Sequence, residues 1–421
     1  MPRPPEWSRN LAIYEVNLRQ FSPQGTFREF EEHLPRLREM GVGIIWLMPI
    51  HPIGEVNRKG SLGSYYSVKD YLAVNPEHGT MEDFRHLVQA IHEHGMYVII
   101  DWVANHTAWD NSLTKEHPEW FTRGPDGLFM PPVADWTDVI DLNYGIPELG
   151  DYMVDALRFW VRETGIDGFR CDVAGMVPTA FWEGVRPALD SVKPVFMLAE
   201  WDTPEMHPSF DMTYDWDLYR TFNGIAKDKK NASAIVSHLT RDWRRYPATA
   251  YRMQFTSNHD ENSWNGTEYE RLGAGAEAFA VVAFTVPGMP LIYSGQEAGL
   301  DRRLAFFDKD PIEWREHGMT SVYRSLLALK RRNRALWNGA SGGPMIRVHT
   351  SEDKAILAFV RARDENQVFV VANLSAHPLS FRLKGTLFPG TYTDLFSAER
   401  VTFDRKATLS LGPWEYRVYE R

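Results

Sequence analysis

Apolar runs and amphipathic stretches alternate along the chain from the N-terminus to about residue 336. The run GIIWLMPI at 43–50 is continuously apolar, as expected of a strand covered on both faces of a parallel sheet. Apolar residues in 26–40 recur at helical spacing, and Thr80 followed by Asp83 is close to a capping arrangement for a helix. The alternation therefore predicts an α/β fold built around parallel strands.

We interpret this pattern as eight strand–helix pairs. The predicted strands are 13–21, 43–50, 96–103, 165–173, 194–201, 210–216, 251–258 and 289–295. Seven helices are predicted directly, with none between 201 and 210, at 26–40, 80–94, 147–164, 179–190, 232–245, 272–285 and 319–336. This count favours a closed (β/α)8 TIM barrel over an open doubly wound sheet, whose dinucleotide-binding glycine fingerprint is also missing from the sequence.

Two segments break the alternation. Residues 107–147 follow the third strand and combine Gly and Pro with several aromatic residues, so we expect an inserted lobe whose aromatic side chains bury surface. From residue 341, short strands separated by turn residues predict an antiparallel β-sandwich. The expected domains are a barrel of residues 1–106 and 148–340, a lobe of residues 107–147 and a C-terminal sandwich of residues 341–421.

The net negative charge of the chain excludes some classes of binding partner. The chain has 46 Lys and Arg against 56 Asp and Glu, and the formal charge of −10 argues against nucleic acid or an anionic membrane surface. No apolar run reaches the length of a membrane span, and the first residues lack a signal-peptide core, so we expect a cytoplasmic protein or the mature form of an exported one. The single cysteine, Cys171, excludes an internal disulfide and a cysteine zinc cluster. The sequence does not predict an oligomeric state.

Polar side chains follow four of the predicted barrel strands, and the active site of such a barrel lies at the carboxyl ends of its strands. These residues are Asp101 and His106 at the end of strand three, Arg170 and Asp172 at the end of strand four, Glu200 at the end of strand five, and His259 and Asp260 at the end of strand seven. Any one of them alone has a plausible structural role. Several carboxylates at one rim, however, repel one another and are normally kept for function.

The residue types point to glycoside hydrolysis. Asp172 and Glu200 on adjacent strands could stand about 5–5.5 Å apart, the separation found in retaining enzymes that form a covalent intermediate. Arg170 lies two residues before Asp172 on the same strand face, so its charge is expected to hold Asp172 ionised as a nucleophile. Glu200 must start protonated, and the charges of Asp172 and Asp260 would raise its pKa.

A metal centre is the main competing chemistry. Its candidate ligands are Asp101, His106, Asp172, Glu200, His259 and Asp260. The histidines lack H-E-x-x-H or helical i, i+4 spacing, and Arg170 beside Asp172 would oppose a cation. We therefore expect the chemistry to require no cofactor.

Four motifs together resemble the signature regions of the α-amylase family, glycoside hydrolase family 13. They are DWVANH at 101–106, GFRCD at 168–172, the Glu of LAEW at 198–201 and SNHDEN at 257–262, in the family's order and approximate spacing. The resemblance spans essentially the whole chain. It implies a catalytic barrel, a lobe inserted after strand three and a C-terminal antiparallel β domain.

The resemblance also implies roles for individual residues. Asp172 matches the nucleophile, Glu200 the acid/base, and Asp260 the carboxylate that binds and helps distort the sugar. The residues that match sugar-binding or supporting positions are His106, Arg170 and His259 around the sugar, Asp101 on strand three and the stacking Tyr66. Beside the motifs, Trp201 and Trp264 are candidate platforms for sugar rings, with simple packing as the alternative.

Two departures from the family pattern bear on specificity and on calcium. Gly175 and Met176 stand where many α-amylases have Lys-His, so contacts to the leaving group must differ. Asn105 and Asp141 match positions that bind calcium in many relatives, although two oxygen ligands fall far short of the six to eight that Ca²⁺ takes. A structural calcium at these residues is thus an expectation that rests on the resemblance, with local loop hydrogen bonding as the alternative.

The resemblance implies a retaining hydrolase acting on α-1,4-glucosidic bonds of starch-like α-glucans or maltooligosaccharides. The alternatives on the same residues are an α-glucosidase, a cyclomaltodextrinase or maltogenic amylase, and a transglycosylase. A non-catalytic relative, such as the barrel ectodomains that escort amino-acid transporters, would lack the carboxylates and carry a membrane span. This sequence has all three carboxylates and no such span.

Overall fold

The computed structural model describes residues 4–421 and is built around a closed barrel of eight parallel strands. Neighbouring strands follow the order β1-β10-β9-β8-β7-β6-β3-β2. Their bounds are β1 (Ile13–Val16), β2 (Ile44–Leu47), β3 (Tyr97–Trp102), β6 (Gly168–Cys171), β7 (Phe196–Ala199), β8 (Met212–Tyr214), β9 (Tyr251–Gln254) and β10 (Met289–Tyr293). All eight predicted barrel strands are therefore confirmed.

Most barrel strands, such as β2 and β3, are apolar on both faces for most of their length, which explains why these segments show no hydrophobic–polar alternation. On β3, Ile99 packs inside the barrel with Trp46 and Leu198. Its neighbours Val98 and Ile100 belong to the larger apolar cluster that also holds the helices' buried faces. Period-two alternation thus places one set of side chains inside the barrel and the other under the helices.

The helices surround this barrel. Their bounds are α1 (Leu18–Phe21), α2 (Phe27–Glu31), α3 (Leu34–Met40), α4 (Met81–Glu93), α6 (Pro147–Thr164), α7 (Thr179–Asp190), α8 (Trp216–Ala226), α9 (Ser233–Arg245), α10 (Glu268–Leu272), α11 (Ala276–Thr285) and α12 (Gly318–Arg332). The capping box predicted from Thr80 and Asp83 is present at the start of α4. The predicted helix 26–40 is two helices, because the chain interrupts its helical path between Glu31 and Leu34.

The prediction of eight strand–helix pairs was wrong at one connection. Residues 200–211 between β7 and β8 contain only a 3-10 turn, Pro204–Met206, and no α-helix. The Asp211 carboxylate accepts hydrogen bonds from the Met197 N–H at 2.9 Å and from Arg186 at 3.0 Å. These bonds fix the short connection to β7 and α7. The helix α8, which our sequence pattern missed, follows β8 and is N-capped by Asp215.

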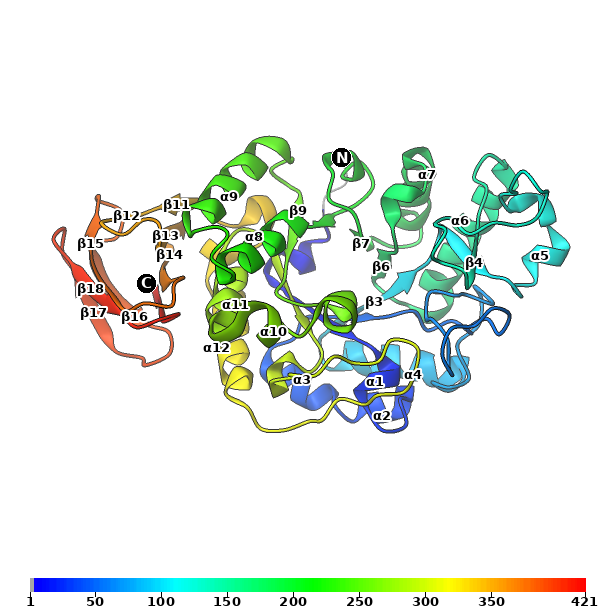
Figure 1. Ribbon diagram of the computed structural model, residues 1–421, viewed down its shortest axis with the longest axis horizontal. Helices are drawn as coiled ribbons and strands as arrows, with labels where there is room; N and C mark the ends of the chain where they lie inside the picture. The colour runs from blue at the N-terminus through cyan, green and yellow to red at the C-terminus, as the bar shows by residue number, and fades with distance from the viewer. Residues whose placement is uncertain (1–3) are drawn as a thin grey trace.

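The inserted segment and the C-terminal region lie at opposite ends of the barrel (Figure 1). The lobe holds the short helix α5 (Leu113–Glu116) and a two-stranded antiparallel sheet of β4 (His106–Ala108) and β5 (Val139–Asp141). Trp120 and Phe121 are buried beneath it, as expected of a lobe that buries its own aromatic residues.

The C-terminal region forms two antiparallel sheets, which confirms the predicted sandwich. One sheet has the order β11-β13-β14-β19-β16-β17 and the other β12-β15-β18. The bounds are β11 (Met345–Arg347), β12 (His349–Thr350), β13 (Ile356–Arg363), β14 (Asn366–Asn373), β15 (Leu379–Lys384), β16 (Gly390–Asp394), β17 (Arg400–Phe403), β18 (Thr408–Leu411) and β19 (Tyr416–Glu420). Phe369 from one sheet and Phe381 from the other share one core.

A buried arginine joins the C-terminal sheets to the barrel. Arg361 on β13 donates to the carbonyls of Thr285 and Val286 at the end of α11, at 3.1 and 2.8 Å. Backbone carbonyls thus satisfy a guanidinium that is almost completely buried. No helix within residues 4–421 has both the length and the apolar character that crossing a bilayer requires.

Candidate active site

A cavity of about 380 Å³ lies at the carboxyl ends of the barrel strands. It contains six of the residues singled out from the sequence, namely Tyr66, His106, Asp172, Glu200, Asp260 and Trp264. The remaining lining residues are Lys59, Ser64, Trp136, Asp138, Val139, Val173, Phe306 and Phe307, none of which we had proposed from the sequence. The predicted strand ends therefore meet in one concave site.

Arg170 on β6 contacts three carboxylates. Its Nη1 donates to Asp101 Oδ1 and to Asp172 Oδ1, each at 2.8 Å. Its Nη2 lies 2.9 Å from Glu200 Oε2, although the N–H bonds do not point at that oxygen, so this contact is an ion pair without an aligned hydrogen bond. Asp172 and Glu200 thus face adjacent nitrogens of a single guanidinium group.

The backbone after Asp172 orients Glu200. Val173 has φ +36° and ψ 45°, a left-handed conformation that β-branched residues rarely adopt. In this conformation the Val173 N–H donates to Glu200 Oε2 at 2.8 Å. Such strain costs on the order of 1–3 kcal/mol and collects at functional sites. We infer that the turn is maintained because it fixes the position of the Glu200 carboxyl.

Burial dominates the protonation of the carboxyls around Arg170. It raises the pKa of Asp172 to about 6 and that of Glu200 to about 7, in each case against the lowering effect of Arg170. For Glu200, the charges of Asp172 and Asp260 raise the pKa further, as expected from the sequence. We had expected the guanidinium to dominate at Asp172. It is outweighed by desolvation, although Asp172 still carries the lower pKa of the two.

A second group of contacts surrounds His259. Its Nε2 lies 2.7 Å from the Tyr66 hydroxyl and 3.2 Å from Asp260 Oδ2, and its Nδ1 contacts Glu15 Oε1 at 2.5 Å. Burial alone would lower the pKa of His259, but Asp260 and Glu15 raise it well above the usual value. Burial would likewise raise the pKa of Asp260, but His259 lowers it. The pair is therefore an ionised imidazolium and carboxylate.

Glu15 is a site residue that the sequence analysis missed. It lies in β1, is fully buried, and one of its oxygens has no hydrogen-bond partner. The available signal was a single carboxylate inside the otherwise apolar run 11–16, because charged residues are almost never fully buried unless they are paired.

The predicted sugar-binding residues occupy two layers. Asp101 is fully buried and receives bonds from Arg170, Trp46 and Tyr66, so it lies behind the cavity wall. Arg170 and His259 are also buried and do not line the cavity. His106 does line it, 3.9 Å from Asp172, and burial lowers its pKa to about 3, which keeps this imidazole neutral.

The two predicted tryptophan platforms differ. Trp264 is 53% exposed, lines the cavity and packs its ring against Phe306 at 5.1 Å between centroids. Trp201 does not line the cavity but lies directly on Gly175, where an added Cβ would come within 2.1 Å of the indole ring. This contact explains why residue 175 is glycine in this chain. A sugar contact by Trp201 stays a prediction.

The candidate calcium residues are neighbours but form an incomplete ligand set. Asp141 is paired with His106 in the β4–β5 ladder, and the Asn105 carbonyl accepts from the Leu142 N–H at 3.1 Å. The Asn105 amide already contacts His106 Nδ1 at 3.2 Å. Among residues 4–421, Asp141 belongs to no cluster of three His, Cys, Asp or Glu side chains that could together hold a metal ion. The side chains present do not supply the six to eight oxygens of a calcium site.

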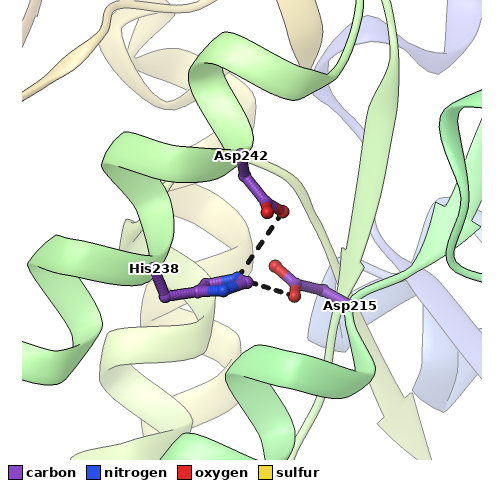
Figure 2. Close-up of side chains that lie close together, drawn as sticks. All are labelled: Asp215, His238 and Asp242. Atoms are coloured by element: carbon purple, nitrogen blue, oxygen red, sulfur yellow. Dashed lines mark ion pairs between the residues drawn. The ribbon is translucent and has the colours of Figure 1, made fainter.

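A different group, Asp215, His238 and Asp242, brings three possible metal ligands together (Figure 2). His238 Nε2 lies 2.8 Å from Asp215 and 3.5 Å from Asp242. The Arg252 guanidinium lies 3.5 Å from Asp215 and 3.2 Å from Asp242, so a protein cation already compensates the negative charge of these carboxylates. Burial would lower the pKa of His238, but the two aspartates raise it. We interpret this group as a buried ion-pair network that holds α8 and α9 against the barrel, not as a metal centre.

Residues 13–126 and 133–343 match the sequence model of the α-amylase catalytic domain. The chain belongs to the α-amylase family. Residues 346–418 of this α-amylase family member match the maltogenic amylase C-terminal domain. The family is one of glycosidases, so the protein is a glycosidase, as expected from its strand-end motifs.

Individual members of the family are similar over nearly the full chain. A noncanonic maltogenic α-amylase from Thermotoga neapolitana has a solved structure that is 32% identical, with a TM-score of 0.90 and coverage of 98% of both chains. An α-amylase from Lactobacillus plantarum is 31% identical, with a TM-score of 0.88 and coverage of 99% of both. A maltogenic α-amylase from Bacillus acidopullulyticus is 25% identical over 99% of this chain and 78% of its own.

Proposed function

We propose that this protein hydrolyses α-1,4-glucosidic bonds of maltooligosaccharides and starch-like α-glucans with retention of configuration. The observation that carries this proposal is the pair Asp172 and Glu200 on adjacent nitrogens of Arg170 at one end of the cavity. A close carboxyl pair of unequal pKa is what a retaining mechanism uses as nucleophile and acid/base. The relatives described above carry α-amylase names, which supports the substrate class.

In the first step, Asp172 attacks the anomeric carbon while Glu200 gives its proton to the leaving glycosidic oxygen. The bond from sugar to leaving group breaks as the bond to the Asp172 oxygen forms. In the second step, Glu200 takes a proton from water, and the resulting hydroxide displaces Asp172 from the anomeric carbon. Two displacements restore the original configuration. No step requires a metal or a cofactor.

The other cavity residues bind and position the sugar. Asp260 presents an ionised carboxylate to the cavity, and its contact with His259 keeps it in place. Tyr66 and neutral His106 supply an aromatic face and a hydrogen-bonding ring on the side of Asp172. Asp101 and Glu15 do not line the cavity. They hold Arg170 and His259 in position through direct contacts.

The anomeric form of the first product tests the proposal. Maltotetraose or maltotriose is mixed with the enzyme in an NMR tube, and the newly formed reducing end is followed before mutarotation mixes the anomers. Retention predicts that the α-anomer appears first. Early appearance of the β-anomer would show inversion and would contradict the assignment of Asp172 as nucleophile.

The dependence of kcat/KM on pH provides a second test. Asp172 must be ionised, so activity falls as pH drops through its pKa of about 6. Glu200 must be protonated, so activity falls as pH rises through its pKa of about 7. We expect a bell-shaped profile with its maximum between about 6 and 7, measured on a maltooligosaccharide. A flat profile from pH 4 to pH 9 would exclude this pair as the acid and the nucleophile.

Among the alternatives on the same machinery, a maltogenic amylase has the most support, because the C-terminal match and two of the relatives are described as maltogenic. An α-glucosidase, a cyclomaltodextrinase and a transglycosylase are separated from it by product analysis on maltotriose, cyclodextrin and starch. We also propose a cytoplasmic or mature exported location and no nucleic-acid or membrane partner. Calcium at Asn105 and Asp141 stays a prediction, tested by comparing Tm in EDTA with Tm in Ca²⁺.

A further inference from the structure

One side of the cavity is closed by contacts between segments that are far apart in sequence. Lys59, in the connection between β2 and α4, extends its amine to Asp138 of the lobe, with Nζ 3.0 Å from Asp138 Oδ1. The same amine donates to the Asp135 carbonyl at 2.8 Å. Lys59 and Asp138 both line the cavity. We call this pair of contacts the Lys59 bridge.

The connection that carries Lys59 is also attached to the segment after β10. Ser61 donates through its backbone N–H to Asp308 at 2.8 Å, and the Leu62 N–H donates to the Phe307 carbonyl at 3.1 Å. Gly60 has φ +62°, and an added Cβ would come within 2.4 Å of Phe307 Cβ. Only glycine permits this close approach. Segments from three places in the chain therefore meet along one edge of the cavity.

The Lys59 bridge is connected to the nucleophile through two aromatic rings of the lobe and the barrel rim. Trp136, next to Asp135, packs against His106 with 5.5 Å between ring centroids, and His106 in turn lies 3.9 Å from Asp172. The leaving group must lie beside Glu200, because the acid has to reach the glycosidic oxygen. The Lys59 bridge thus faces the part of the substrate that becomes attached to Asp172, the glycone.

We propose that the Lys59 bridge closes the glycone end of the cavity, so that the enzyme acts on chain ends and short oligosaccharides in preference to interior bonds of long chains. The inference rests on the proposed function. A cavity of about 380 Å³ is near the lower end of the range for small-molecule sites, and this size suits a short glycone. An ammonium group has three N–H donors, and two have the protein partners named above, so one is left to bind a glycone hydroxyl.

The bridge can be tested on amylose and maltotriose. For each variant, the loss of iodine staining of amylose is plotted against the number of reducing ends released. An enzyme that cleaves only near chain ends leaves long amylose chains intact, so the staining falls slowly as reducing ends are released. We expect this result for the unmodified protein. Lys59→Ala opens the cavity edge, and the loss of staining per reducing end released is expected to increase several-fold. Loss of the ammonium donor is expected to lower kcat/KM on maltotriose about tenfold relative to amylose.

Two further variants control the interpretation. Lys69, in the same connection, pairs with Asp110 of the lobe at 3.1 Å and with Glu55 of its own connection at 2.9 Å, but does not line the cavity. Lys69→Ala should therefore keep the product pattern of the unmodified protein. Asp138→Asn preserves side-chain shape while removing the charge that holds Lys59, and it should reproduce the pattern of Lys59→Ala even if that variant folds poorly.

The outcomes separate the inference from the proposed function. A steep iodine plot for the unmodified protein would overturn the inference, and so would unchanged patterns in both Lys59→Ala and Asp138→Asn. Absence of any α-1,4 hydrolysis by the unmodified protein would instead overturn the proposed function.

Discussion

Replacing Glu200 with glutamine is expected to lower turnover on maltooligosaccharides by about 10³-fold or more, with the fold intact. Glutamine can still accept the Val173 N–H bond that orients residue 200, but it has no proton to give to the leaving oxygen. The effect should depend on the leaving group. A maltosyl fluoride, whose fluoride departs without protonation, should lose much less of its rate in the first step than maltotriose does.

The same substitution is expected to raise Tm above pH 7. Burial raises the pKa of Glu200 to about 7, so the folded protein binds this proton more tightly than the unfolded chain does. A raised carboxyl pKa removes stability as pH rises from the unfolded value towards the folded one. Glutamine carries no charge, and Asp101 and Asp172 still compensate Arg170. Stability and activity should therefore change in opposite directions.

Kinetics and thermal unfolding at pH 8 provide the measurements. Glu183→Gln is the matched control, because Glu183 is exposed on α7 and does not line the cavity, and it should leave both kcat and Tm unchanged. Added azide should restore part of the second step in Glu200→Gln, since azide attacks the anomeric carbon without base assistance. Near-normal hydrolysis of maltotriose by this variant would refute the acid/base role.

The barrel was predictable from the sequence because its strands are short and apolar on both faces. Apolar spacing and length could separate strands from helices at segments such as 43–50 and 147–164, which form β2 and α6. They missed α8 (Trp216–Ala226), whereas at residues 200–211, where no helix was predicted, the Asp211 carboxylate holds a connection without one. The count of eight strand–helix pairs was therefore wrong at a connection that one buried side chain stabilises.

Some residues of the candidate site could be predicted from the sequence, and others could not. Asp172 and Glu200 could be found because they directly follow β6 and β7, and Asp260 because it lies in the connection after β9, and strand ends meet by topology. Lys59 and Asp138 could not be found, because they lie on loops whose meeting depends on tertiary packing and not on any spacing in the sequence. The same reasoning applies to protonation. The sequence places Arg170 beside Asp172 but does not give the degree of burial, and burial decides the direction of the pKa shift.

Replacing Asp172 with asparagine is expected to have the largest effect of all, a loss of roughly 10⁴-fold or more in kcat. An amide cannot attack the anomeric carbon, and the rest of the cavity cannot supply a second nucleophile in the same place. Arg170 keeps its contacts with Asp101 and Glu200, so near-UV circular dichroism should match that of the unmodified protein.

Covalent trapping identifies the attacking residue directly. A 2-deoxy-2-fluoro or 5-fluoro glycosyl fluoride slows the second step, so the unmodified protein should accumulate one glycosyl adduct that peptide mapping locates at Asp172. Asp172→Asn should form none, whereas Asp101→Asn should still be labelled, because Asp101 is fully buried behind Arg170 and Tyr66 and cannot reach a sugar. An adduct mapped to Asp260 or to Glu200 would reassign the nucleophile, because only the carboxylate that attacks can remain bonded to the anomeric carbon.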